Sequence, residues 1–273
     1  MRPRKDSVSS GGDLSREMSV RVGRVPYARG RQCPLPSYPD HTNVVCLTAS
    51  SPYGSLSPYE LRDKDGRCLE NLWQFAKIYS TVPAVSRKQS RRDGAVVWDH
   101  PAETHVMKGE ILPAYWGWRK KGMDTVEAVR YPVTFDLDRR ASCRGALWNP
   151  EPGADQSVPW VGASVAACLD YVQARKTIYV PIYEAAVREQ VQFKDLVARL
   201  KAGENLLIIE VDGPHQESLQ YYMDTYSVTS DFIEGGTVLA TEGNLDILLN
   251  DTLHPYGHGY CLARCLIRET LVA

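Results

Sequence analysis

The segment from Leu69 to Tyr79 is apolar except for one narrow polar stripe. On a helix, which turns about 100° per residue, Glu70, Gln74 and Lys77 fall within roughly 60° of one another. Asn71 lies beside them. A carboxylate, an amide and an amine grouped in this way are suited to acid–base chemistry and to binding a charged ligand if they face a cavity. The same stripe is also consistent with a solvated face that carries an ion pair.

A second candidate is the His-Pro-Tyr-Gly-His-Gly segment at residues 254–259, just before a predicted final helix. Two histidines four residues apart can bind a metal from one helical face, but Pro255 and Gly257 argue against a helix here. No further ligand has suitable spacing, so we predict no metal site. The glycines let the backbone approach a ligand closely, and N–H groups at a helix N-terminus favour a phosphate. A simple helix-entry turn explains the same residues.

A third candidate is Asp212, which follows an apolar run from Leu206 to Val211. That run predicts a buried strand. A carboxylate at the end of such a strand either faces a site or supplies turn chemistry before Gly213 and Pro214. The sequence contains no Gly-x-x-x-x-Gly-Lys-Ser/Thr, Gly-x-Gly-x-x-Gly or Gly-x-Ser-x-Gly motif. It therefore gives no support to nucleotide binding through those loops or to a serine hydrolase.

Composition limits the class of protein. The chain has 273 residues, 43% hydrophobic and 24% charged, which suits one large domain or two small ones. No apolar run approaches the roughly 20 residues that span a bilayer, and no secretory signal is visible. Seven cysteines without a Cys-x-x-Cys pair favour a reducing, intracellular location over a disulfide framework or a zinc site. The net charge of −1 argues against a protein that coats nucleic acid.

The coarse element pattern predicts a tail and one folded region. Residues 1–42 are rich in Ser, Gly, Pro and Arg, and we expect a flexible basic tail with, at most, weak affinity for nucleic acid. The folded domain is predicted over 43–273. Its expected elements are strands at 44–47, 206–211 and 237–240, a hairpin turn at 63–66, and helices at 69–79, 165–176, 181–203 and from about 261 onward.

Residues 80–160 are harder to interpret. Val96 to Trp98 is compatible with a strand, and Pro113 to Lys121 combines aromatic with basic residues. Such a segment can stack on bases and hold phosphates. Its aromatic residues can equally belong to the core, with a solvated basic edge.

Several segments together resemble the NADAR (YbiA-like) family, whose name refers to NAD and ADP-ribose. Tyr53 to Tyr59 is similar to that family's Tyr-Gly-x-Phe-Ser-Asn-Phe loop, although it departs from the loop at both Phe positions and at the Asn. Glu70 to Lys77 fits the family's Glu-x-x-aromatic-Gln-x-x-Lys helix at every named position. The strand that ends in Glu210 and the segment from Tyr256 to Gly259 resemble the family's later strand and its Trp-Gly-x-Gly loop, in the same order.

This resemblance implies an α+β fold, a helix-rich single domain of the YbiA-like type with a small sheet. Against that pattern, residues at about 80–160 and 212–250 look like insertions. The implied function is hydrolysis of N-glycosidic bonds in ADP-ribose or ribose-phosphate compounds, including removal of ADP-ribose from guanine in nucleic acid. The implied partners are a nucleotide or ADP-ribose-type ligand and nucleic acid, with no cofactor and no membrane.

The resemblance also assigns catalytic roles to Glu70 and Lys77. Cleavage of a C1′–N bond develops positive charge on the ribose, which a nearby carboxylate stabilises. Glu70 can also protonate the leaving base or activate water, and Lys77 can bind a phosphate or, when neutral, attack C1′. The predicted ligand-binding residues are Tyr53, Gly54, Asn71, Trp73, Gln74, Glu210, Asp212, His254, Tyr256, Gly257, His258 and Gly259.

Two other functions remain open from the sequence. The first is a non-catalytic module that recognises ADP-ribose or a nucleotide. The second is a structural protein that has kept only the fold. Both ligand-based functions require Glu70, Lys77, Glu210 and the 254–259 segment to converge on one pocket, and both fail if these residues lie on different faces.

Overall fold

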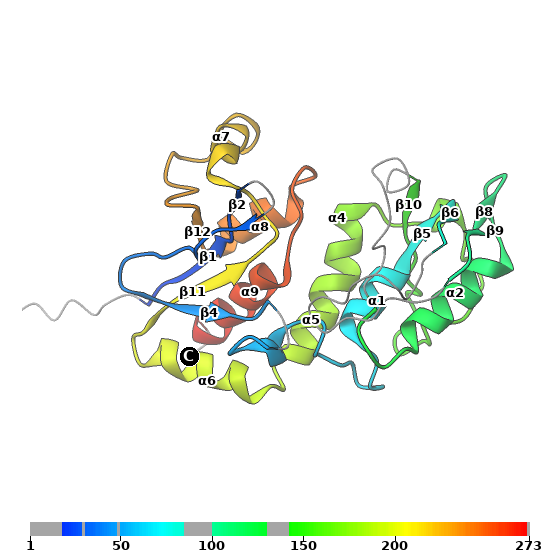
Figure 1. Cartoon of the computed structure of the whole chain (residues 1–273), viewed down its shortest axis with the longest axis horizontal. Coiled ribbons are helices and arrows are strands. Elements are labelled where there is room, and N and C mark those ends of the chain that lie inside the picture. Colours follow the sequence, from blue (N-terminus) through cyan, green and yellow to red (C-terminus); the bar gives the residue numbers. More distant parts are fainter. Residues whose placement is uncertain (1–17, 29–30, 48–49, 85–99, 130–141, 272–273) are drawn as a thin grey trace, which may run out of the picture.

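A computed structural model describes residues 18–28, 31–47, 50–84, 100–129 and 142–271, which form a mixed α+β domain (Figure 1). The predicted α+β class is therefore confirmed. The strands are β1 (Val20–Arg24), β2 (Tyr27–Ala28), β3 (Arg31–Gln32), β4 (His41–Val45), β5 (Lys77–Tyr79), β6 (Thr81–Val82), β7 (Glu103–Thr104), β8 (Val106–Met107), β9 (Glu110–Ile111), β10 (Cys143–Ala146), β11 (Asn205–Glu210) and β12 (Thr237–Leu239). The α-helices are α1 (Leu69–Ala76), α2 (Pro113–Met123), α4 (Tyr171–Ala174), α5 (Val180–Val187), α6 (Val191–Lys201), α7 (Leu219–Tyr226), α8 (Glu242–Asn250) and α9 (His258–Leu271).

A four-stranded sheet in the order β12-β1-β11-β4 forms one side of the molecule. β1 and β4 both run parallel to β11, which lies between them, and β12 pairs antiparallel with β1. β11 is buried from Leu206 to Glu210, as its unbroken apolar run predicts for a strand covered on both faces. The carboxyl ends of β1 and β11 lie side by side, because Arg24 is in register with Glu210.

The predicted flexible tail over 1–42 is wrong in its boundary. Val20–Arg24 is an inner strand, with Val20 and Val22 buried in the main core. Gly23 packs closely there, because an added Cβ would lie 3.0 Å from Pro36 Cγ and 3.1 Å from Leu207 Cδ1. Two alternating valines in a basic segment are too short a pattern to reveal a strand whose partner lies far along the chain. Residues 1–17 lie outside the described part of the structure.

A long helical segment from Tyr171 to Val187 connects the two sides of the molecule (Figure 1). We predicted that one helix would stop at Arg175 and Lys176 and that another would begin at Pro181. Instead, a π-helical stretch, Arg175–Tyr179, joins α4 to α5. A widened turn of this kind accommodates a proline inside a helix, since proline lacks an N–H and crowds the preceding turn. The helix predicted over 181–203 is split between α5 and α6.

On the other side of the molecule, α1 packs against α2 and leads directly into β5, which pairs with β10 (Figure 1). α1 ends at Ala76 rather than at Tyr79, because Lys77 takes up an extended conformation with φ −69° and ψ 143°. Ile78 and Tyr79 are buried as strand residues. The helix prediction is therefore correct for Glu70 and Gln74 and wrong for Lys77.

The aromatic and basic segment from Pro113 to Lys121 belongs mostly to the core. Tyr115 and Trp118 are buried, and Arg119 is 0% exposed. The Arg119 guanidinium donates hydrogen bonds to the carbonyls of Gln156 at 2.6 Å and Leu147 at 3.0 Å. These contacts favour the core interpretation over base stacking. The strand considered at Val96–Trp98 lies outside the described residues.

The helix predicted over 165–176 begins only at Tyr171, because Val165–Ala167 forms a short 3-10 turn and Cys168 is extended. The other expectations hold with small shifts. β4 begins at His41, three residues before the predicted strand at 44–47. The 63–66 turn is present, with Gly66 at φ +79°, and β12 falls within 237–240. α8 was not predicted from the sequence, and α9 begins at His258 rather than near 261. Whether the segments at 80–160 and 212–250 are insertions stays a prediction.

Candidate functional site

The polar stripe of α1 is a chain of three hydrogen-bonded side chains. Gln74 Nε2 donates to Glu70 Oε1 at 2.8 Å, and Lys77 Nζ donates to Gln74 Oε1 at 2.8 Å. The Lys77 ammonium also lies 4.7 Å from the centroid of the Trp73 ring. Lys77 stays on the same side as Glu70 although the helix has ended. The predicted grouping of these three residues is therefore confirmed.

Lys77 is electrostatically linked to residues from elsewhere in the fold. Burial lowers the pKa of its ammonium group, and the charges of Glu70, Cys143 and Asp212 oppose that shift. Asp212 comes from the carboxyl end of β11, more than 130 residues along the chain. We call Glu70, Gln74, Lys77 and Asp212 the charged cluster.

Asp212 is the link between the two halves of the site. Its side chain reaches solvent, yet the surrounding protein and then the charge of Glu210 raise its pKa to about 6. The charge of Glu70 also raises this pKa, whereas His258 and Arg24 lower it. Residues from α1, β1, β11 and α9 thus lie close enough to influence one carboxyl group. Whether these residues line one pocket together with the 254–259 segment, as both ligand-based functions require, stays a prediction.

Glu210 has a structural role that the sequence did not indicate. The residue is buried, and its carboxylate accepts hydrogen bonds from the backbone N–H groups of Val211 at 2.7 Å, Asp212 at 3.2 Å and Gly259 at 2.6 Å. An added Cβ at Gly257 would lie 2.4 Å from the Glu210 carboxyl carbon. Gly257 and Gly259 are therefore needed for the close approach of an internal carboxylate. The expectation that this helix N-terminus receives a ligand phosphate is wrong, because Glu210 occupies it.

His258 completes this buried ion pair. Its Nδ1 lies 3.4 Å from Glu210 Oε2, and its Nε2 lies 3.0 Å from the Cys46 carbonyl oxygen. Burial opposes the charged form, but the Glu210 carboxylate and Cys46 raise the pKa of His258 to about 10. A pKa of about 10 makes the ring an imidazolium at neutral pH, which donates from Nε2 to Cys46 and lies at ion-pair distance from Glu210. In the described ranges, no group of three or more His, Cys, Asp or Glu residues is arranged to hold a metal ion.

Asn71 is a correction to the predicted ligand-binding residues. It is 0% exposed, and its amide donates to the carbonyls of Thr125 at 2.8 Å and Glu127 at 2.9 Å. Its oxygen accepts from the backbone N–H of Val129 at 2.7 Å. These three bonds hold the segment after α2 against α1, so the side chain is not available to a ligand.

The aromatic wall beside the charged cluster combines Trp73 with two tyrosines. The Trp73 ring lies 5.0 Å from that of Tyr179 and 6.3 Å from that of Tyr171. Trp73 is 8% exposed, whereas Tyr171 is 44% exposed. Burial raises the pKa of Tyr171, and the charge of Asp212 also raises it, which places its hydroxyl near the cluster. Tyr171 is a candidate ligand contact that the sequence did not suggest.

Tyr53 and Gly54 lie at the end of β4 and have local partners. The Tyr53 backbone N–H donates to Val45, and its hydroxyl accepts from Arg199, which pairs with Glu204. Gly54 is buried and begins a short 3-10 turn, where its N–H donates to Ser51. No described contact joins either residue to the charged cluster.

His254 and Tyr256 are positioned by different neighbours. His254 Nδ1 lies 2.6 Å from Oδ2 of Asp251, a carboxylate that is 0% exposed. The hydroxyls of Tyr221 and Tyr222 also donate to Asp251. Tyr256 is buried against the ring of Tyr260, 5.4 Å away. The 254–259 segment is thus organised mainly by protein contacts.

Arg24 is the other site residue that sequence reasoning missed. It ends β1, beside Glu210, and its guanidinium donates to the carbonyl of Gly213. It went unnoticed because it lies in the segment predicted as a tail. No local sequence signal marks it, because the alternation of Val20 and Val22 is too short to reveal the strand.

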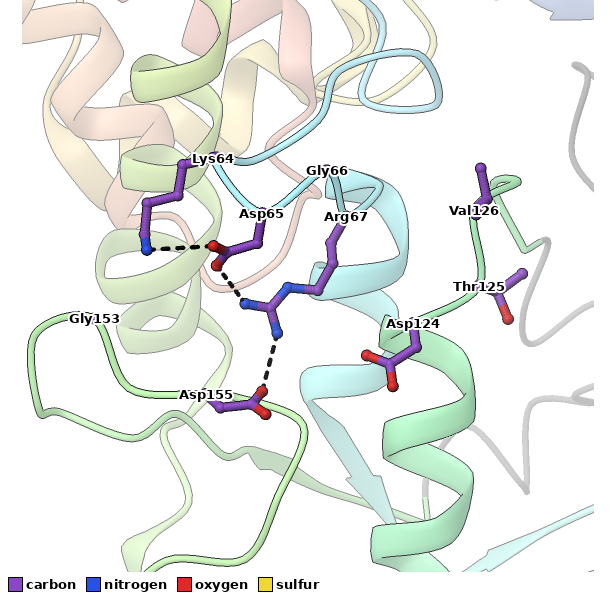
Figure 2. Close-up of a pocket in the computed structure, with 9 residues that line it drawn as sticks. All are labelled: Lys64, Asp65, Gly66, Arg67, Asp124, Thr125, Val126, Gly153 and Asp155. Carbon is purple, nitrogen blue, oxygen red and sulfur yellow. Dashed lines mark hydrogen bonds and ion pairs between the residues drawn. The ribbon is translucent and has the colours of Figure 1, made fainter.

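A separate hollow of about 550 Å³ lies beside the turn that precedes α1 (Figure 2). Its charged side chains are paired with one another: Lys64 with Asp65 at 3.4 Å, and Arg67 with Asp65 at 2.8 Å and Asp155 at 3.1 Å. None of the predicted site residues lines it. The hollow is lined by Lys64, Asp65, Gly66, Arg67, Asp124, Thr125, Val126, Gly153 and Asp155.

Comparison with protein-family models, with curated proteins and with solved structures finds no match. The NADAR resemblance therefore remains a prediction from the sequence motifs. Among the described helices, none is both long and apolar enough to cross a membrane.

Proposed function

We propose that the protein hydrolyses N-glycosidic bonds in ADP-ribose or ribose-phosphate compounds, with ADP-ribose on guanine in nucleic acid as one substrate to test. The observation that carries the proposal is the charged cluster. It brings two carboxylates, Glu70 and Asp212, and the amine of Lys77 within electrostatic range of one another. The motif residues that prompted the NADAR resemblance contribute two of these three groups.

The two carboxylates suit the two charge movements of the reaction. When the C1′–N bond breaks, its electron pair moves to the base nitrogen and positive charge develops on the ribose. Asp212, whose pKa is raised to about 6, is the group suited to donate a proton to the leaving base. Glu70 stabilises the ribose cation and accepts the proton of the water that adds to C1′. The products are a ribose compound that carries a hydroxyl group on C1′ and the free base.

In this scheme, Lys77 mainly positions the Glu70 carboxylate. Its hydrogen bond to Gln74, and that of Gln74 to Glu70, orient the carboxylate from one side. Burial lowers the pKa of Lys77, because removal from water disfavours the charged ammonium form. The same shift leaves the amine a better nucleophile toward C1′ than an exposed lysine would be.

Substitution of Glu70 by Gln tests the proposal. We expect the Glu70→Gln variant to fold normally and to lose about 100-fold or more in kcat/KM for release of ADP-ribose from a modified oligonucleotide, or for hydrolysis of NAD. Glu189→Gln, which changes an exposed carboxylate after α5, is the matched control and should keep full activity. Full activity in Glu70→Gln would contradict the assigned role.

Calorimetry with ADP-ribose separates the enzyme from the binding module. Binding without any product from wild-type protein would favour the non-catalytic module. Neither binding nor product would favour a structural protein that has kept only the fold.

A further inference from the structure

The buried carboxylate of Asp251, the residue that follows α8, gathers hydrogen-bond donors around both of its oxygens. Its Oδ1 accepts from the Tyr221 hydroxyl at 2.8 Å and from the Leu253 backbone N–H at 2.9 Å. Its Oδ2 accepts from the Tyr222 hydroxyl and lies 2.6 Å from Nδ1 of His254. Burial raises the pKa of this carboxyl, but the hydrogen bonds bring it below its ordinary value, so Asp251 is ionised at neutral pH.

The imidazole of His254 is oriented by this carboxylate. Because Nδ1 faces an ionised acceptor, it carries a proton, and Nε2 is then the basic nitrogen of the neutral ring. Among the described residues, both polar contacts of the ring involve Nδ1, the second one with the Tyr222 hydroxyl at 3.0 Å. The side chain is 16% exposed. Nε2 is therefore the ring nitrogen that can meet a ligand or water, as in enzymes that use a histidine held by an aspartate as general base.

A buried arginine fixes the backbone that carries Asp251 and His254, which we call the dyad. Arg175 lies in the π-helical stretch between α4 and α5 and donates to the carbonyl oxygens of Leu248, at 3.1 Å, and of Asp251. A π-helical turn inside a helix frequently marks a functional site. Asp251 is thus held through both its backbone and its side chain, and the ring of His254 has a fixed position from which it can act.

The surroundings of the His254 ring are aromatic and apolar. The Tyr222 ring stacks on it with centroids 5.2 Å apart, and the Tyr221 ring meets it edge-on at 5.3 Å. The side chain of Leu253, the preceding residue, is exposed. Arg175 is too deeply buried to offer its charge to a ligand here. These neighbours suit an uncharged ligand with an apolar part better than a phosphate, which needs exposed cationic donors.

We propose that the dyad is a proton-transfer centre that activates water against an uncharged acyl ester. Nε2 of His254 accepts a proton from water while the water oxygen bonds to the carbonyl carbon. The imidazolium, stabilised by Asp251, then returns the proton to the alcohol oxygen as the bond between that oxygen and the carbonyl carbon breaks. The products are a carboxylic acid and an alcohol. This activity goes beyond the proposed function and does not depend on the charged cluster.

Hydrolysis of p-nitrophenyl acetate tests the activity. We expect kcat/KM to fall about 10-fold or more in His254→Gln, because the proton acceptor is lost. We expect a similar loss in Asp251→Asn, because the amide donates to Nδ1 and leaves the proton on Nε2. Asp246→Asn is the matched control, since Asp246 lies in α8 and pairs with Arg264 at 2.9 Å, and it should keep the wild-type rate.

Nitrogen-15 NMR of the histidine rings supplies a second readout, which needs no ester. We expect the Nδ1–H form of His254 in wild-type protein and the Nε2–H form in Asp251→Asn. An Nε2–H form in wild-type protein would refute the centre, because no basic nitrogen would then face the ligand.

Equal turnover of the ester by wild type and folded His254→Gln would also refute the centre, whether or not Asp251→Asn folds. The same holds for a single burst of p-nitrophenolate without turnover, which marks simple acylation of a side chain. Circular dichroism establishes that each variant is folded.

Discussion

At the residue scale, Glu210 and His258 show that the residues of a motif can have a different role from the one expected of them. The two glycines at 257 and 259 were expected to admit a ligand, and they admit the Glu210 carboxylate instead. His258 then balances that buried charge, and the Cys46 carbonyl accepts a hydrogen bond from its Nε2. Breaking a buried pair by removing one partner is strongly destabilising, because the other charge is left uncompensated.

This ion pair predicts a pH dependence of stability. The folded pKa of His258, raised to about 10, lies above its ordinary value near 6.5, so the folded state holds a proton that the unfolded state releases. The contribution of His258 is therefore complete below about pH 6.5 and is lost as pH rises toward 10. We expect wild-type protein to lose stability over this range relative to His258→Gln, by on the order of a few kcal/mol.

Urea unfolding at pH 6.5, 8 and 9.5 measures the effect as a difference between the two proteins. His41→Gln is the control, because the His41 ring contacts the Pro39 carbonyl and the Ser19 hydroxyl rather than a carboxylate. The difference between wild type and control should stay constant with pH. A constant difference between wild type and His258→Gln would show that the Glu210–His258 pair does not hold the proton.

At the element scale, the beginning of α9 depends on its contact with the end of β11. The first turn of this helix is packed directly on the Glu210 side chain, so the backbone at 257 and 259 has no room for a side chain. The helix starts three residues earlier than expected because Glu210 satisfies the N–H of Gly259. A partner on a different element thus sets the helix boundary.

We therefore predict that Gly257→Ala destabilises the protein by about 1–3 kcal/mol, because its Cβ would collide with the Glu210 carboxyl group. Gly243→Ala is the matched control. Gly243 lies in α8 with nothing within 4 Å of an added Cβ, and alanine there should be neutral or stabilise by up to about 1 kcal/mol. Equal effects of the two substitutions on urea midpoints would contradict this account of the glycine.

Which elements could be predicted follows from whether their signal is local. β11 was predictable because the consecutive apolar residues Leu206 to Ile209 share one buried environment, and α1 was predictable up to Ala76 from its helical period. β1 was not, since its five residues gain their burial from β11 and β12, both far along the chain. The continuous helix through Pro181 was missed because the compensating π-helical turn leaves no local sign.

At the scale of the whole molecule, the site depends on contacts between distant segments. The α1 side contributes Glu70 and Lys77, and the sheet side contributes Arg24 and Asp212. Figure 1 shows α1 and the strand ends of β1 and β11 on opposite sides of the α4–α5 segment. Helical spacing could group Glu70 with Lys77, and the end of a buried strand could mark Asp212. Nothing in the sequence could join these groups to Arg24 or remove Asn71 from the list.

The most direct test of this convergence is hydrogen exchange of the backbone amides with and without ADP-ribose. If the ligand binds between the strand ends and α1, protection should rise together at Arg24 and Val25, at Asp212 and Gly213, and from Gln74 to Lys77. Protection confined to the hollow lined by residues 64–67 and 124–126 (Figure 2), or to only one side of the charged cluster, would contradict the account.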